Sequence, residues 1–250
     1  MERWERRLRL ASGLTIATFV ILHLTNHAAG VFSFAALDAV RKVIVPIWDN
    51  WVLGPLLYTM FLLHFLLGLW SLYRRSHLRM PPWEAFQLSL GLLVWPLLMV
   101  HAVGVRAVAF QYDIPVLHEN VIALIWKDGW ASVVRQSLLI VIVWSHMCIG
   151  LHYWLRLKGW YARLQPYLFA LAVVIPTLAL LGFIRSGLEV LDRPNDPAWD
   201  LRLPQAAPAD SYGYGSGGYG SGGGYGSGGG YGAGGGYGSG GYDSGGYGSY

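Results

Sequence analysis

Two short stretches, His64-Phe-Leu-Leu-Gly68 and His146-Met-Cys-Ile-Gly150, place a histidine inside a long apolar run with a glycine four residues later. Each histidine lies ten residues before the first arginine after its run, Arg74 or Arg156. A helical rise of about 1.5 Å per residue puts both imidazoles about 15 Å from that end, near the centre of a bilayer. Two histidines at one depth, each with a glycine one turn away, suggest a flat cofactor held between two helices.

The composition excludes an ordinary soluble domain. Of the 250 residues, 54% are hydrophobic and 13% are charged, whereas soluble domains carry about a quarter charged residues. The single cysteine, Cys148, leaves no internal disulfide and no cysteine-ligated iron–sulfur or zinc site. The net charge of +4 comes from arginines beside the apolar runs, without the basic face that nucleic acid requires. We therefore expect a membrane lipid environment and no nucleic-acid partner.

The apolar runs predict an all-α membrane protein with five transmembrane helices. Each run is close to the twenty residues that span the hydrocarbon. The first run is too long for a cleaved signal peptide and contains polar residues, so we interpret it as a retained span. The predicted spans are residues 10–34, 51–73, 86–109, 132–155 and 166–185.

Positive charges set the predicted orientation. The N-terminal segment and the loops 74–85 and 156–165 carry ten Lys and Arg residues, against five on the opposite side. The positive-inside rule therefore places the N-terminus in the cytoplasm and, after five spans, the C-terminal tail in the periplasm. The outward loops contain amphipathic stretches at 36–47 and 116–126, which we expect to lie in the membrane interface. If residues 116–126 crossed instead, the last two helices would be inverted.

Composition divides the chain into three parts. Residues 1–190 form the predicted transmembrane domain, and residues 191–210 form a polar linker that contains prolines. Residues 211–250 are a Gly/Tyr/Ser-rich low-complexity repeat. Such a repeat cannot bury enough surface to offset the entropy of ordering it, so we predict a disordered tail.

Four of the five spans contain a histidine, and the depths of these histidines fall into two pairs. Ionisable side chains inside a membrane are costly and usually face the bundle interior. Spans one and three run outward and spans two and four run inward, so each parallel pair can stand diagonally in a four-helix bundle, with the fifth span flanking it. We predict two haem b groups with two histidine ligands each, which suits electron transfer and leaves no open site for oxygen. The predicted pairs are His23 with His101, and His64 with His146.

Small residues beside the ligands support this hypothesis. Gly68, Gly104 and Gly150 follow their histidines by three or four residues on the same helix face, where a side chain would hit a porphyrin ring. Span one has no such glycine. Instead His27 follows His23 by one turn, and it is the alternative ligand, nearer the outer interface.

Two other residues are candidates for contacts with a cofactor or a quinone. His152 lies six residues after His146, close to the cytoplasmic boundary, and could bond a haem propionate or a quinone. A plain interfacial histidine is an equally good interpretation of His152. Asp49, near the outer end of the second span, could carry protons for a quinol site.

The pattern resembles the five-helix, two-haem cytochrome b anchor of succinate:quinone oxidoreductases and fumarate reductases, over residues 1–190. The resemblance implies a subunit without catalysis of its own, which passes electrons between the quinone pool and a soluble partner at the cytoplasmic face of a bacterial inner membrane. That family pairs the first histidine with the third and the second with the fourth. The resemblance is carried by Arg6-Arg7-Leu8 before His23-Leu24, by both His-x-x-x-Gly motifs, and by His101 before Arg106.

A closer resemblance is to the membrane anchor of certain bacterial class III adenylate cyclases, which is thought to sense redox state. After Leu191 the chain departs from it, with no sixth apolar run, no cluster cysteines and no cyclase. The alternative function is therefore a redox- or quinone-sensing anchor for a signalling partner, such as a cyclase, in another chain. A haem-free scaffold that displays the tail is a third hypothesis. The matching stretches are HLTNHAAG at 23–30, RMPPWEA at 79–85 and HMCIGLHYWLR at 146–156.

Overall fold

The computed structural model describes residues 3–77, 79–112 and 118–196, without the side chains of residues 108, 109, 112 and 118. Within these ranges the chain is all-helical and contains no strand, which confirms the all-α part of the predicted fold class. The predicted tail at 211–250 lies outside the described residues. The helices are α1 (Arg3–Ala29), α2 (Phe34–Trp48), α3 (Leu53–Tyr73), α4 (Pro82–Tyr112), α5 (His118–Lys127), α6 (Trp130–Leu155) and α7 (Tyr161–Asp192).

Five of these helices, α1, α3, α4, α6 and α7, are long and apolar enough to cross a membrane, as the sequence predicts. They fit a multi-pass membrane protein whose outward helix faces contact lipid. The other two, α2 and α5, fall on the stretches predicted to be amphipathic and have 15 and 10 residues. Ten residues rise about 15 Å, half of the hydrocarbon thickness, so α5 is too short to cross the membrane. The orientation predicted for the two helices after it is therefore not reversed.

The limits of the helices differ from the predicted spans. The first span was predicted at 10–34, but α1 begins at Arg3 and ends at Ala29. It ends there because the N–H groups of residues 30–32 bond carbonyls three residues earlier, after which the Ser33 hydroxyl caps α2. Both α4 and α7 also continue into polar sequence beyond their apolar runs. The apolar run sets where a helix can cross, whereas the capping groups set where it ends.

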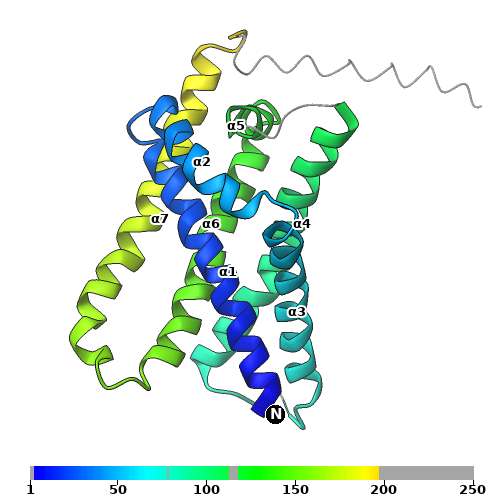
Figure 1. Ribbon diagram of the computed structural model, residues 1–250, viewed down its shortest axis with the longest axis vertical. Helices are drawn as coiled ribbons and strands as arrows, with labels where there is room; N and C mark the ends of the chain where they lie inside the picture. Colours follow the sequence, from blue (N-terminus) through cyan, green and yellow to red (C-terminus); the bar gives the residue numbers. More distant parts are fainter. Residues whose placement is uncertain (1–2, 78, 113–117, 197–250) are drawn as a thin grey trace, which may run out of the picture. The chain divides into compact units, whose positions relative to one another are not determined.

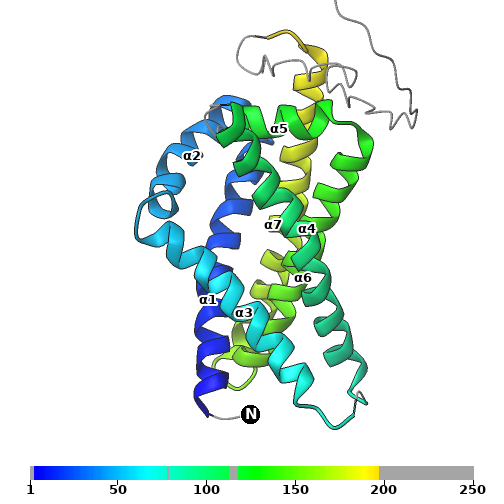
Figure 2. The same ribbon diagram turned by 90° about the vertical axis from the view of Figure 1, so that its right-hand side faces the viewer.

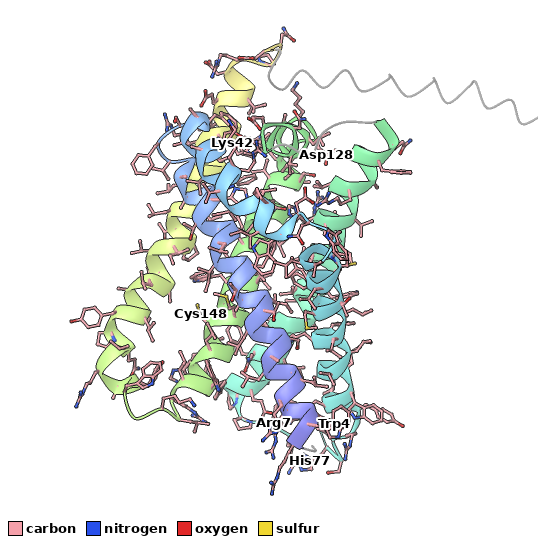
Figure 3. All side chains as sticks on the ribbon, in the orientation of Figure 1. Trp4, Arg7, Lys42, His77, Asp128 and Cys148 are labelled. Carbon is pink, nitrogen blue, oxygen red and sulfur yellow. The ribbon has the colours of Figure 1, made fainter. Side chains whose placement is uncertain are left out.

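Figures 1 and 2 show how the long helices stand side by side, with α1 along α3 and α7, and α4 along α6. The start of α1, the α3–α4 turn and the α6–α7 turn lie at one end, which we call the N-terminal end. The short helix α5 lies across the opposite end, which we call the α5 end. In Figure 3, Arg7 and His77 lie at the N-terminal end, and Lys42 and Asp128 lie toward the α5 end.

Small residues bring α7 into close contact with α1 and α5. A Cβ atom added to Gly182 would overlap the backbone carbonyl of His27 in α1. A Cβ atom added to Gly187 would overlap the ring of Trp126 in α5. Small side chains at a helix interface let two backbones approach closely, which is the usual basis of helix packing in membranes. These two glycines therefore fix the position of α7 at the α5 end.

A buried carboxylate joins α1 to α3 at the N-terminal end. Glu5, in the first turn of α1, is only 3% exposed. It accepts hydrogen bonds from Trp70 Nε1 at 3.0 Å and from Arg74 Nη1 at 2.9 Å. A carboxylate in the first turn also interacts favourably with the helix dipole. This contact holds the end of α3 against α1, close to the place where a histidine of α3 meets the same helix.

Candidate functional site

His64 of α3 and His146 of α6 face each other across the bundle. Their ring centroids are 6.3 Å apart, and their ring planes are 85° apart. Two metal–nitrogen bonds of about 2.0–2.1 Å, plus about 1 Å from each nitrogen to its ring centre, place two imidazoles on one metal about 6 Å apart. These two histidines, which we call the near pair, therefore have the separation that a shared metal requires.

His23 of α1 and His101 of α4 form a second pair, which we call the far pair. Their ring centroids are also 6.3 Å apart, with ring planes at 59°. The near pair meets α1 at Ser12, and His23 lies eleven residues further along that helix. At 1.5 Å per residue the two pairs are about 16 Å apart along the bundle. The structure thus brings together the same residues that the sequence paired by depth.

Backbone carbonyls determine which ring nitrogen carries the proton in each histidine of the near pair. His64 Nδ1 lies 3.2 Å from the Arg9 carbonyl oxygen and 3.2 Å from the Ser12 hydroxyl. His146 Nδ1 lies 3.0 Å from the Gln87 carbonyl oxygen. A carbonyl can only accept, so each Nδ1 carries the proton and each Nε2 keeps a lone pair. Metal-ligating histidines usually donate their other N–H group in this way, which orients the ring.

Two glycines that the sequence reasoning missed lie directly against these rings. A Cβ atom on Gly13 would be 3.0 Å from His64 Cε1, and one on Gly91 would be 2.7 Å from His146 Cε1. Both glycines are on the helix beside the ligand helix, and spacing along a single helix does not show which residues of a neighbouring helix touch its histidine. Their absent side chains let each imidazole rest on the neighbouring backbone.

The three glycines predicted to lie beside a porphyrin have different surroundings. A Cβ atom on Gly150 would lie 3.1 Å from Gln87 Nε2, so this position faces α4. Gly68 and Gly104 would meet no described atom within 4 Å, and Gly104 is exposed. The contact of Gly68 and Gly104 with a cofactor stays a prediction.

The alternative ligand His27 lies beside His23 rather than across from it. The His27 and His23 ring centroids are 4.8 Å apart at 88°, and His27 also contacts Phe183 of α7 with centroids 6.5 Å apart. His27 is buried between α1 and α7. His23 is therefore the histidine of α1 that faces His101, and His27 packs behind it.

The remaining candidate residues lie at the two ends of the bundle. His152 Nδ1 is 2.6 Å from the hydroxyl of Tyr161, at the turn between α6 and α7. Asp49 follows the last residue of α2, where it accepts a hydrogen bond of 3.2 Å from Arg106 Nη2. Both Asp49 and Arg106 have side chains that are more than half exposed.

The arrangement suits a planar cofactor better than a bare metal ion. Among the described residues there is no group of three or more His, Cys, Asp or Glu side chains that could hold an ion. Two facing imidazoles could supply only two ligands, so a metal held between them would need its other ligands from the group that carries it, as the four nitrogens of a porphyrin do. No family model, curated protein or solved structure matches the chain.

Proposed function

We propose that this chain is a membrane-embedded diheme b-type cytochrome that carries electrons between the quinone pool and a partner subunit. The observation that supports it is the pair of facing histidine sets, each with ring centroids 6.3 Å apart, at two levels of one bundle. Haem iron with two imidazole ligands takes up and releases one electron and offers no open position to oxygen. The function that follows is electron transfer along the bundle.

The chain's own residues have three roles in this proposal. His64 and His146 would hold one haem, and His23 and His101 would hold the other. The carbonyls that accept the Nδ1–H bonds of the near pair make its imidazoles more basic ligands and keep their rings in one orientation. The apolar faces of the surrounding helices exclude water, which is one of the factors that set a haem potential.

The direct test is a haem measurement on the full chain, purified in detergent from cells with ample haem. We expect two haem b per chain, a low-spin spectrum with two histidine ligands, and two one-electron steps in a redox titration. Protein that is folded and free of haem would refute the proposal.

The proposed orientation places the N-terminal end of the bundle in the cytoplasm of a bacterial inner membrane. The turn between α3 and α4 lies at that end and carries Arg75, which is paired with Glu84, and the exposed His77. We propose this turn as the docking face of the soluble partner. A charged surface of this kind guides association more than it adds affinity.

The ligands of the far haem provide a sharp prediction. We expect His23→Ala and His101→Ala each to lower the haem content from two per chain to one, whereas His27→Ala keeps both haems. The reason is that His23 faces His101 at 6.3 Å, while His27 packs toward α7. Haem content and the reduced-minus-oxidised spectrum measure the result. If His27→Ala lost a haem and His23→Ala kept both, His27 would be the ligand of the far haem in place of His23.

Asp49 is the proposed proton carrier of a quinol site near the α5 end. We expect Asp49→Asn to slow the reduction of haem by a short-chain quinol by about a hundredfold or more, the lower limit of general-base effects, and to leave haem content unchanged. Asp38→Asn on the same helix is the control. The Lys42 ammonium and the Arg41 guanidinium keep the pKa of Asp38 below its ordinary value, so Asp38 is charged. An unchanged rate in Asp49→Asn would remove Asp49 from the proposed site.

A further inference from the structure

The two halves of the bundle repeat one pattern of residues. In the first helix of each half, α1 or α4, a glycine comes ten residues before a histidine. In the second helix, α3 or α6, a histidine is followed by a glycine after four residues and an arginine after ten. The matching residues are Gly13, His23, His64, Gly68 and Arg74 in one half, and Gly91, His101, His146, Gly150 and Arg156 in the other.

The same contact joins the two helices of each half. In the first half, the ring of His64 meets the Arg9 carbonyl and lies 3.0 Å from where a Cβ atom of Gly13 would be, four residues later on α1. In the second half, the ring of His146 meets the Gln87 carbonyl and, again four residues later, Gly91 on α4. The ring atom nearest to the position of the missing Cβ is Cε1 in both halves.

Helix geometry explains why a glycine is needed at this spacing. In an α-helix each Cα–Cβ bond points toward the N-terminus, so the side chain at position i+4 covers the turn that holds the carbonyl of residue i. That carbonyl already accepts the helical bond from residue i+4 and has one further lone pair, which at Arg9 the Ser12 hydroxyl also approaches, at 3.1 Å. Without a Cβ at i+4, an imidazole can reach that lone pair from the side. Arg9 and Gly13, and Gln87 and Gly91, have this spacing.

We propose that Gly13 and Gly91 are positioning residues, which form matching cradles that fix the ring planes of His64 and His146 and point both Nε2 atoms at one haem iron. This inference rests on the proposed function. The cradles belong to the near pair alone, because the far pair lies about 16 Å further along the bundle. The ring planes of the near pair are 85° apart, so the two imidazoles that would hold this haem stand almost perpendicular to each other.

The test compares Gly13→Ala and Gly91→Ala with the wild-type chain, each purified with haem. A methyl group in either cradle must push Cε1 of the histidine away, which turns the ring and weakens its Nδ1–H bond. Electron paramagnetic resonance of the oxidised protein reports the angle between axial imidazoles, and a redox titration reports each midpoint potential. We expect both variants to displace the most anisotropic low-spin signal and to shift one and the same midpoint potential, while the other haem is unchanged.

The controls separate the inference from the proposed function. Gly159 lies in the turn between α6 and α7, and a Cβ atom added there would meet no described atom within 4 Å, so Gly159→Ala should behave as wild type. Wild-type protein without haem would refute the proposed function itself. Two haems in the wild type, with both signals unchanged in Gly13→Ala and Gly91→Ala, would overturn the cradles and leave the function standing.

A third variant keeps the inference testable if the alanine chains do not accumulate. Ser12→Ala adds no atoms and removes the hydroxyl that lies 3.2 Å from His64 Nδ1. We expect it to shift the same midpoint potential as a cradle variant and to leave the far haem unchanged. If Ser12→Ala shifted the midpoint potential of the far haem, or shifted neither potential, the turn of α1 from Arg9 to Gly13 would have no role in positioning His64.

Discussion

His64→Ala and His146→Ala should each lower the haem content from two per chain to one, and the haem that remains should be the same in both variants. The two side chains belong to different helices and lie 82 positions apart in the sequence, yet their ring centroids are 6.3 Å apart. Either substitution leaves one axial imidazole, and one ligand holds a haem far less tightly than two. The measurement is the haem-to-protein ratio together with the redox titration of the remaining haem.

The pairing itself is tested by the double variant. If His64 and His146 hold the same haem, the double variant also keeps one haem, the far one. The first substitution already releases the near haem, so the second substitution has nothing further to release. Such non-additivity is the sign of two groups that act as a unit. Single variants that delete different haems, or a double variant with none, would contradict the pairing. His152→Ala is the matched control on α6, since His152 contacts Tyr161 at the end of the helix.

The sequence could predict the pairs because depth depends only on helical rise. An apolar run positions its helix in the membrane, and a fixed rise per residue then gives each histidine a depth, whatever the neighbouring helices are. His23 and His27 were harder to separate, since both lie on one helix a single turn apart. Their roles differ in the structure because α7 packs behind His27 and contacts it through Phe183.

Gly13 and Gly91 could not be predicted in the same way. Which face of α1 meets α3, and which face of α4 meets α6, depends on the packing of side chains between helices, and depth carries no information on it. The ten-residue spacing from each glycine to the next histidine is visible in the sequence, but it gains a meaning only when His64 and His146 lie on those glycines. Helix ends were missed for a related reason, because α1 begins with a buried contact of Glu5 outside the apolar run.

Among the glycines that the structure describes, Gly182 is the one at which alanine should lower the stability most. The new Cβ would overlap the backbone carbonyl of His27, which cannot rotate away as a side chain can. Overpacking of this kind costs about 3 kcal/mol or more when the backbone must move. For a chain of this size that corresponds to an apparent Tm lower by about 6–12 °C. Thermal unfolding of the purified protein in detergent measures it.

Gly187→Ala tests whether a methyl group that overlaps a side chain costs less stability than one that overlaps the backbone. Its Cβ would overlap the ring of Trp126, a side chain that can change its rotamer at the cost of its packing against Phe183. We therefore expect a smaller loss of stability than in Gly182→Ala, while Gly159→Ala, with open space around it, should match the wild type. Equal stability of Gly182→Ala and Gly159→Ala would contradict the close contact of α7 with α1.

The effect of Gly182→Ala on haem follows from the place of the contact. The carbonyl that the new methyl group displaces belongs to His27, one turn from His23, so α1 must shift at the level of the far pair. The near pair meets α1 about 16 Å away, close to the contact of Glu5 that holds α1 against α3. Mild heating of Gly182→Ala should therefore release the far haem before the near haem. Release of both haems together, at the temperature of unfolding, would instead mean that α7 supports the whole bundle as one unit.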